Sequence, residues 1–246
     1  EHASNEVMIQ RILSTTLILS ALGAMLGFAA AEAKERRVQK VDIQVLDENE
    51  VGFLDADRIE GRLGTNRLEG ELLNDVDLQL ILSHLTDMDA CERAEVYAQM
   101  NGTVHIDVWQ RHPVLRVHMT DTGEDHYLDE DGRRMPLDVH FTPHIPVMHV
   151  KRETQAHMGF RFVNATKDDP FWNALTDQLS MNDDGELVLH PRLAGHEVIL
   201  GNADNCEHKK RNLLAFYRAQ VKRGNLRNYK RIDLTYRDQV IAQRYP

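Results

Sequence analysis

Charge-free and alternating stretches divide the chain into three parts. From Ile12 to Ala31 the sequence holds no charged residue. A helix of that length spans roughly 30 Å at about 1.5 Å per residue, the thickness of the hydrocarbon core of a bilayer. A cleaved signal peptide has a shorter apolar region before a small-residue site such as the one at 29–33. The pattern therefore favours an uncleaved transmembrane helix at 12–31, between a short N-terminus (1–11) and a linker (32–37).

The charges beside this apolar segment leave its orientation open. Arg11 precedes the segment, whereas four basic residues follow it, namely Lys34, Arg36, Arg37 and Lys40. The bias of basic residues toward the cytoplasmic side would by itself place the C-terminal part in the cytoplasm. A start at Met8 would add an amino-terminal charge next to Arg11 and would favour a cytoplasmic N-terminus instead.

Residues 38–112 carry the pattern of a small α+β domain. Residues 38–45 alternate as a half-buried strand does, and Asp55 and Asn74 can each cap a following amphipathic helix. Two further alternating runs meet at Asn101-Gly102, whose residues tolerate the positive φ of a hairpin turn. The order strand, helix, helix, strand, strand predicts two helices on one face of a three-stranded sheet, which is the order of a POTRA module.

Residues 113–246 predict a mixed β-domain with a few helices. Short apolar runs such as 144–150 and 185–190 alternate with Gly, Pro and Asp turns, and 183–186 predicts a hairpin. One helix is expected after Asp169-Pro170, carrying residues up to Leu179, and another at about 205–223. The chain then closes on one last strand, with Ile232, Leu234 and Tyr236 on the same face.

The composition of the chain argues against some classes of function but does not identify one. The net charge of −10 argues against a nucleic-acid binder, which normally carries a basic surface. Cys91 and Cys206 lie far apart and form no CxxC pair, so they indicate no metal framework and leave their pairing open. The thirteen histidines include no HExxH or HxH motif, and no metal or cofactor site is predicted.

The stretch from Arg111 to Leu137 is dense in acids and histidines and could therefore suggest acid–base chemistry. However, Asp129-Glu130-Asp131-Gly132 after a strand is the ordinary composition of a turn, in which side-chain oxygens accept hydrogen bonds from nearby backbone N–H groups. P-loop, GxSxG and GxGxxG motifs are absent. The sequence therefore predicts a protein without enzymatic activity.

Four stretches resemble the FtsQ/DivIB family of bacterial division proteins, and their local sequences are most similar to those of Bacteroidetes-type members. "IDVWQRHPVLRV" (106–117) looks like the family's exit from its POTRA domain, and "YLDEDGRRMPL" (127–137) and "HIPVMHV" (144–150) are similar to the strands that follow. "NYKRIDLTYRDQVIAQR" (228–244) is similar to the terminal strand. The order of these stretches along nearly the whole chain strengthens the resemblance.

The resemblance implies a single-pass protein of the inner membrane whose bulk lies in the periplasm at the division septum. It implies a scaffold that binds FtsB and FtsL and helps to control septal peptidoglycan synthesis. Tyr236 corresponds to the family's tyrosine at the FtsB-binding strand, and such a strand can recruit a partner strand through its free backbone edge. The predicted partner-binding residues are Ile232, Leu234, Tyr236, Gln239 and Val240. Alternatively, Tyr236 packs in the core of the β-domain.

Two other functions compete with this expectation. A POTRA-containing protein of export or outer-membrane assembly would normally show several POTRA units or a membrane barrel, whereas only one unit is predicted here. A periplasmic hydrolase using Asp129, Asp131 and nearby histidines would require those groups to lie together in a cleft with strongly shifted pKa values.

Overall fold

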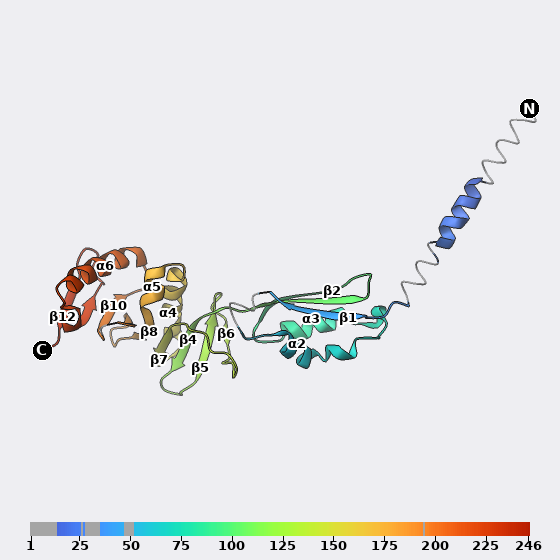
Figure 1. Ribbon diagram of the computed structural model, residues 1–246. Coiled ribbons are helices and arrows are strands. Elements are labelled where there is room, and N and C mark those ends of the chain that lie inside the picture. Colours follow the sequence, from blue (N-terminus) through green and yellow to red (C-terminus); the bar gives the residue numbers. More distant parts are fainter. Residues whose placement is uncertain (1–13, 26, 28–34, 47–51, 194) are drawn as a thin grey trace, which may run out of the picture. The chain divides into compact units, whose positions relative to one another are not determined.

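The computed structural model describes residues 14–25, 27, 35–46, 52–193 and 195–246 (Figure 1). The chain forms two compact units that divide between Gln110 and Arg111, and the described residues 52 and 53 belong to the second unit. The domain boundary expected from the sequence, between residues 112 and 113, differs from this division by two residues.

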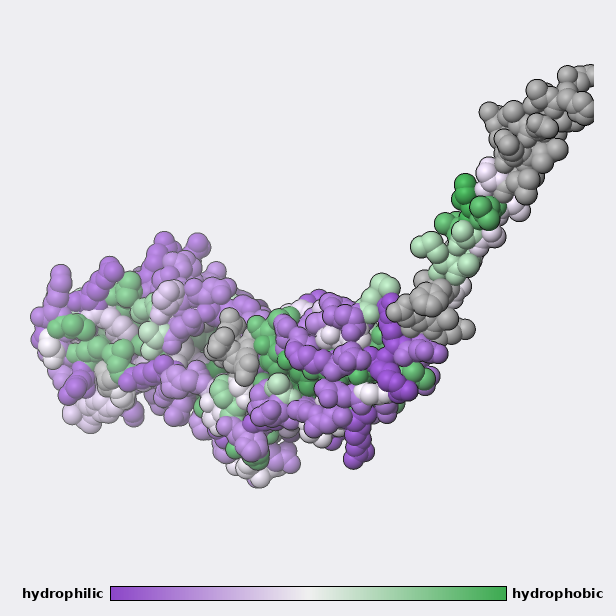
Figure 2. Space-filling model, turned by 45° about the vertical axis from the view of Figure 1, so that its right-hand side comes forward, coloured by the Kyte–Doolittle hydropathy of each residue, from purple (hydrophilic) through white to green (hydrophobic). Residues whose placement is uncertain are grey.

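Residues 14–25 form a helix, and their side chains are exposed. The surface of this helix is largely apolar (Figure 2). Within the described residues, no helix has both the length and the apolar character that crossing a bilayer requires. Residues 12, 13, 26 and 28–31 of the expected span lie outside the described part of the chain, as do residues 1–11.

The first unit has the predicted order of elements. Two α-helices, α2 (Ala56–Leu63) and α3 (Leu78–Thr86), lie between the first strand and the last two; the strands are β1 (Lys40–Val45), β2 (Cys91–Ala98) and β3 (Thr103–Gln110). The sheet order is β1-β3-β2, with β1 parallel and β2 antiparallel to β3. Alternate residues of β3 (Val104, Ile106, Val108) pack with Ile59 of α2 and Leu85 of α3 in one core. This α+β arrangement confirms the prediction.

Helix caps and turns explain most of the boundaries in this unit. Asp55 accepts a hydrogen bond from the backbone N–H of Arg58 at the start of α2, and Gly64, at φ 65°, ends that helix. Gly102, at φ 87°, lies in the turn between β2 and β3 as expected. The cap predicted for α3 is wrong, because Asp77 rather than Asn74 accepts the N–H of Leu80. Asn74 lies in a short 3-10 helix before α3.

The second unit is built on one large sheet. In the described residues its strand order is β12-β11-β10-β9-β8-β7-β4-β5-β6. The strands are β4 (Pro113–Met119), β5 (Asp125–Asp129), β6 (Arg134–Met135), β7 (Val147–Val150), β8 (Thr176–Met181), β9 (Leu187–Pro191), β10 (Glu197–Gly201), β11 (Tyr229–Asp233) and β12 (Ile241–Arg244). Three α-helices accompany them, α4 (Glu153–Thr166), α5 (Pro170–Leu175) and α6 (Cys206–Lys222).

A continuous row of buried side chains crosses this sheet beneath the helices. Paired residues on six neighbouring strands make up the row, and all are fully buried: Val117, Met148, Leu179, Leu189, Val198 and Ile232. Phe162 of α4, Trp172 of α5 and Leu213 of α6 belong to the same core. The three helices therefore cover one face of the sheet, and the row extends as far as β11.

Three expectations for the second unit are wrong. Two helices were expected, whereas the described residues also contain a third, α4. The helix after Pro170 ends at Leu175, so that Leu179 lies in β8. The expected single last strand consists of two antiparallel strands, β11 and β12, joined by residues 234–240. The predicted helix at about 205–223 is confirmed as α6, and the predicted 183–186 turn joins β8 to β9.

Candidate partner-binding surface

Strand β12 forms one edge of the large sheet. Among the described residues it pairs with β11 alone, in an antiparallel register that joins Ile232 to Ala242 and Asp233 to Ile241. Along the side of β12 that faces away from β11, an edge strand presents a row of backbone N–H and C=O groups that no strand of the sheet pairs. Such an edge can pair with a strand from another chain.

Two of the predicted partner-binding residues belong to the core. Ile232 is fully buried and Leu234 is 2% exposed. The backbone N–H of Leu234 donates to Ile199 O at 2.9 Å, which continues the pairing of β11 with β10. These two side chains therefore anchor the terminal segment to the sheet and are not accessible to a partner.

The other three predicted residues lie in the loop between β11 and β12. Tyr236 is 53% exposed, Gln239 is exposed, and Val240 is half-buried against the core. The expectation that Tyr236 shares a strand face with Ile232 and Leu234 is wrong, as is the alternative that it packs in the core. A large aromatic side chain instead lies on the surface, in the loop before the edge strand.

Local hydrogen bonds explain why the chain leaves the strand after Asp233. The Asp233 carboxylate accepts two hydrogen bonds from Thr235, one from the backbone N–H at 2.8 Å and one from the side-chain hydroxyl at 2.6 Å. Such a side-chain-to-backbone turn competes with strand pairing. The loop also passes close to Gly201 at the end of β10, where a Cβ atom would lie 2.9 Å from Thr235 Cγ2. Asn212 of α6 donates to Arg237 O at 3.0 Å and fixes the middle of the loop.

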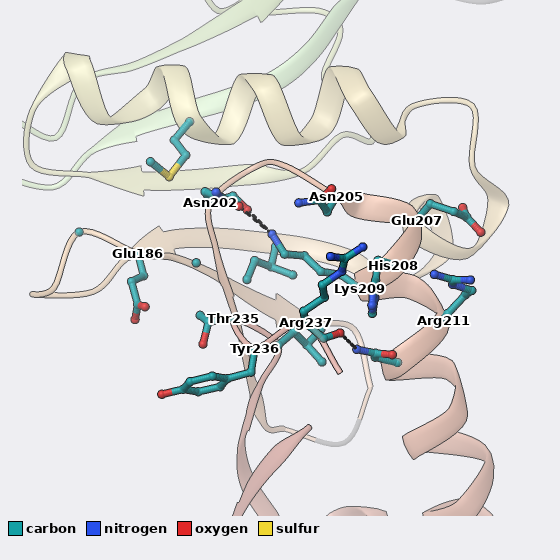
Figure 3. Close-up of a pocket in the computed structure, with 16 residues that line it drawn as sticks. Glu186, Asn202, Asn205, Glu207, His208, Lys209, Arg211, Thr235, Tyr236 and Arg237 are labelled. Carbon is teal, nitrogen blue, oxygen red and sulfur yellow. Dashed lines mark hydrogen bonds between the residues drawn. The ribbon is translucent and has the colours of Figure 1, made fainter. Parts of the chain in front are cut away.

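A groove of about 980 Å³ lies between this loop and the N-terminal half of α6 (Figure 3). Its walls include Asn202, Glu186 and the α6 residues His208 and Arg211, together with Thr235, Tyr236 and Arg237. In Figure 3, Arg237 extends toward α6, whereas the ring of Tyr236 extends to the opposite side of the loop. The loop thus presents a cation to the groove and an aromatic ring beside it.

Positive charge predominates on the α6 side of this groove. Lys209 is 7% exposed, and its ammonium donates to Asn202 O, Asn202 Oδ1 and Asp204 O at 2.7, 3.0 and 2.7 Å. Burial lowers the pKa of Lys209. Within the part of the chain that the structure describes, Arg211 and Arg237 form no ion pair, whereas His208 lies 3.4 Å from Asp238. The guanidinium groups of Arg211 and Arg237 are therefore the cations available to a ligand in this groove, whose lining also contains the carboxylates of Glu186 and Glu207.

The acid-rich stretch at 111–137 forms strands and turns. Asp129 is 5% exposed, and its carboxylate accepts the backbone N–H groups of Asp131 and Arg133 at 3.0 and 2.7 Å, which closes the turn between β5 and β6. The carboxylate of Asp131 is exposed and lies 3.4 Å from Arg133 Nη1. Among the described residues, no group of three or more His, Cys, Asp or Glu side chains has the geometry to hold a metal ion.

Sequence reasoning missed the separate edge strand and the cations of the groove. The signal for the first was Asp233 two residues before Thr235, a spacing that favours a turn even within an alternating pattern. No signal in the sequence brings Arg211 and Arg237 together, because 26 positions separate them and only the return of the chain to the sheet makes them neighbours.

Comparisons with known proteins agree with this architecture. A POTRA-like domain model matches residues 36–109, and the family model described as FtsQ/DivIB, C-terminal related, matches residues 112–243, which is more than half of the chain. The protein named Cell division protein FtsQ from Rhodothermus marinus is 26% identical over 234 residues, covering 89% of this chain and 82% of that protein. With a POTRA-like domain followed by the matched β-domain, the chain belongs to the FtsQ/DivIB family of cell division proteins.

Proposed function

We propose that this chain is a non-catalytic, membrane-anchored scaffold of the division machinery, which binds an FtsB-like protein, together with FtsL, and thereby helps to control septal peptidoglycan synthesis. The observation that carries the proposal is the open edge of β12, together with the exposed ring of Tyr236 in the loop that leads into this strand. The family membership favours this role over that of an export or outer-membrane assembly protein.

Strand addition to β12 is the proposed mode of binding. Main-chain hydrogen bonds to the free edge would supply affinity, and side-chain contacts at the ends of the strand would supply selectivity. Tyr236 suits such a contact, because its ring can bury a large apolar area while its hydroxyl stays available for a hydrogen bond. Gln239 and Val240 lie between Tyr236 and β12 and would line the entry to the edge. Ile232 and Leu234 would support the hairpin from the core.

Membrane anchoring by residues 12–31 is part of the proposal. The described helix at 14–25 exposes five large apolar side chains, Leu17, Ile18, Leu19, Leu22 and Met25. Exposing so many apolar groups to water is unfavourable, and transfer into lipid would remove that cost. We place the rest of the chain in the periplasm of a single-pass inner-membrane protein, at the division septum. Protease accessibility in spheroplasts tests this, because a cytoplasmic POTRA-like domain would resist added protease.

Substitution of Tyr236 tests the binding surface. The dissociation constant of the full chain in detergent for the FtsB-like protein of the same bacterium should rise at least about tenfold in Tyr236→Ala, as is typical of a central aromatic contact. Tyr97 is a suitable control, because it is an exposed tyrosine of the first unit, and Tyr97→Ala should bind as the parent does. Unchanged binding by Tyr236→Ala would contradict the proposed site.

Neighbouring prolines test the edge itself. Backbone N–H groups along a strand point alternately to the two sides, so of Ile241→Pro and Ala242→Pro one removes a donor from the free edge and the other removes a donor to β11. The variant that removes a donor from the free edge should lose partner binding, while the thermal stability of the second unit is unchanged. The variant that removes a donor to β11 should lower that thermal stability. If both variants bind the partner like the parent, strand addition to β12 is wrong.

A further inference from the structure

Five exposed cations gather where the terminal segments of the second unit meet. They come from the end of α6, from the 3-10 helix η3 (Leu226–Asn228), and from β11 and β12: Lys222, Arg223, Arg227, Lys230 and Arg244. We call these five residues the basic end. The chain as a whole carries a net charge of −10, so this local excess of positive charge is against the trend of the sequence.

Backbone hydrogen bonds bring the segments of the basic end together. After α6 the chain turns back, and Gln220 O accepts the N–H groups of Arg223 and Asn225 at 3.1 and 3.0 Å. Asn228 O at the end of η3 then accepts the N–H of Tyr245 at 3.0 Å. Because Tyr229 pairs with Arg244, the start of β11 and the end of β12 lie side by side next to η3.

Little negative charge from the protein offsets the basic end. In the described structure Lys222, Arg223, Arg227 and Lys230 form no ion pair, and Arg244 lies over the ring of Tyr229, 5.3 Å from its centroid. From Lys209 to Pro246 the acidic residues are Asp233 and Asp238. Asp233 holds Thr235, and Asp238 lies beside His208. The nearest carboxylate on β10, Glu197, is taken by Arg231 at 3.3 Å.

The basic end and the Tyr236 loop lie at opposite ends of the same edge strand. The loop leads into Ile241, the first residue of β12, and the basic end surrounds Arg244, the last one. A strand of four residues is about 13 Å long. A partner strand that covers this edge therefore has one of its ends beside the five cations, whichever direction it runs.

We propose that the basic end binds an acidic segment of the partner protein, directly continuous with the partner strand that pairs with β12. This inference rests on the proposed function, since it takes the partner strand on β12 as given. It adds the chemistry of the partner, namely Asp and Glu residues flanking its strand on the side of Arg244. Their attraction to the basic end would accelerate association and fix the direction of the strand, because the reversed strand would leave the cations unpaired.

The continuity of the basic end with the free edge favours a protein segment over a lipid or nucleic-acid surface. A membrane or nucleic acid needs no neighbouring strand, whereas a peptide already held along β12 reaches the cations without further loss of freedom. The side chains of Ile241 at the start of β12 and Tyr245 just after its end are both about half exposed. These belong to the edge that the partner strand would cover.

Charge reversal tests the inference. Lys222→Glu/Arg227→Glu changes one residue in the last turn of an α-helix and one in a 3-10 helix. Arg62→Glu/Arg67→Glu in the first unit makes the same changes in the same kinds of position, with the same change in net charge. We expect the first variant of the full chain in detergent to bind the FtsB-like protein about tenfold more weakly at low salt, and with a smaller salt dependence, and the second to bind like the parent.

The outcomes separate this inference from the proposed function. If Lys222→Glu/Arg227→Glu binds like the parent while Tyr236→Ala does not, the acidic-segment inference is overturned and the edge remains the binding site. If Tyr236→Ala and both proline variants bind normally, the proposed function fails first. Lysines placed at the partner's acidic residues should restore binding to the reversed variant. If Lys222→Glu/Arg227→Glu loses binding to phosphatidylglycerol vesicles but keeps its affinity for the FtsB-like protein, the basic end is a lipid-binding surface and the inference is overturned.

Discussion

Single residues decide where the terminal strand ends. The alternation of Ile232, Leu234 and Tyr236 predicts one long strand, and it places the first two side chains correctly in the core. The hydrogen bonds from Thr235 to Asp233 then turn the chain, and Gly201 leaves room for Thr235 to pass the end of β10. As a result, Tyr236 leaves the sheet and becomes exposed.

Substitution of Gly201 should reveal how much the close passage of the loop matters. Gly201→Ala meets two costs, a left-handed backbone at φ 74° and a Cβ atom 2.9 Å from Thr235 Cγ2. We expect a loss of about 2 kcal/mol in the free energy of unfolding, together with weaker partner binding because the loop is displaced. Urea unfolding followed by the fluorescence of the buried Trp172 measures the first effect.

Gly185 provides the matched control for that substitution. It has φ 78° and no atom within 4 Å of its Cβ position, so Gly185→Ala should lose only the backbone contribution, about 1 kcal/mol, and keep its partner affinity. Thr235→Ser removes Cγ2 and should recover part of the loss in the Gly201→Ala background. Equal losses in the two alanine variants would show that the contact with Thr235 contributes nothing.

At the scale of elements, the sequence predicted the first unit well and the second unit in part. The first unit has local signals at nearly every boundary, such as Asp55 before α2 and Gly102 in the hairpin. Helix α4 lacks such signals, because it holds Gly159 and no acidic or small polar N-cap residue, and the Gln155 side chain caps it by accepting the N–H groups of Lys151 and Arg152. Its helical state depends on packing against the sheet, which a local pattern does not contain.

The packing of α4 predicts that replacing a helix glycine by alanine lowers stability, which is the reverse of the usual effect. Alanine normally stabilises a helix interior by about 1 kcal/mol relative to glycine. At Gly159 an added Cβ would lie 2.0 Å from Met148 Sδ, and Met148 is fully buried in the central row of the sheet. Because overpacking costs roughly 1–3 kcal/mol, we expect Gly159→Ala to destabilise the second unit in urea unfolding.

Gly61 in α2 is the counterpart of Gly159. No atom lies within 4 Å of its Cβ position, so Gly61→Ala should stabilise the first unit by about 1 kcal/mol. Trp109 of β3 and Trp172 of α5 allow the two units to be followed separately in single-tryptophan variants. If Gly159→Ala stabilises the second unit as Gly61→Ala stabilises the first, Met148 moves aside without cost, and the packing of α4 on the sheet tolerates the added methyl group.

At the scale of the whole molecule, three histidines of the second unit are part of its packed interior. His126 and His196 are 1% and 2% exposed, and His190 is half-buried beside Ser180, whose hydroxyl lies 2.8 Å from its Nε2. Burial lowers the pKa of all three. Their number in the sequence suggested chemistry, yet three-dimensional packing gives them roles in the core that spacing alone does not predict.

These buried histidines predict that the second unit loses stability in mild acid. Below the ordinary histidine pKa of about 6.5 the unfolded chain binds protons that the folded unit resists, so the free energy of unfolding falls as pH decreases from that value toward the lowered folded pKa values. The urea midpoint reported by Trp172 should therefore drop between about pH 7 and pH 5. His196→Gln can keep a hydrogen bond to the Tyr217 hydroxyl, 2.7 Å from His196 Nε2 in the parent, and should flatten this dependence, whereas His140→Gln, at an exposed position, should not. If His196→Gln and the parent show the same slope, proton uptake occurs elsewhere and burial of His196 does not set the acid sensitivity.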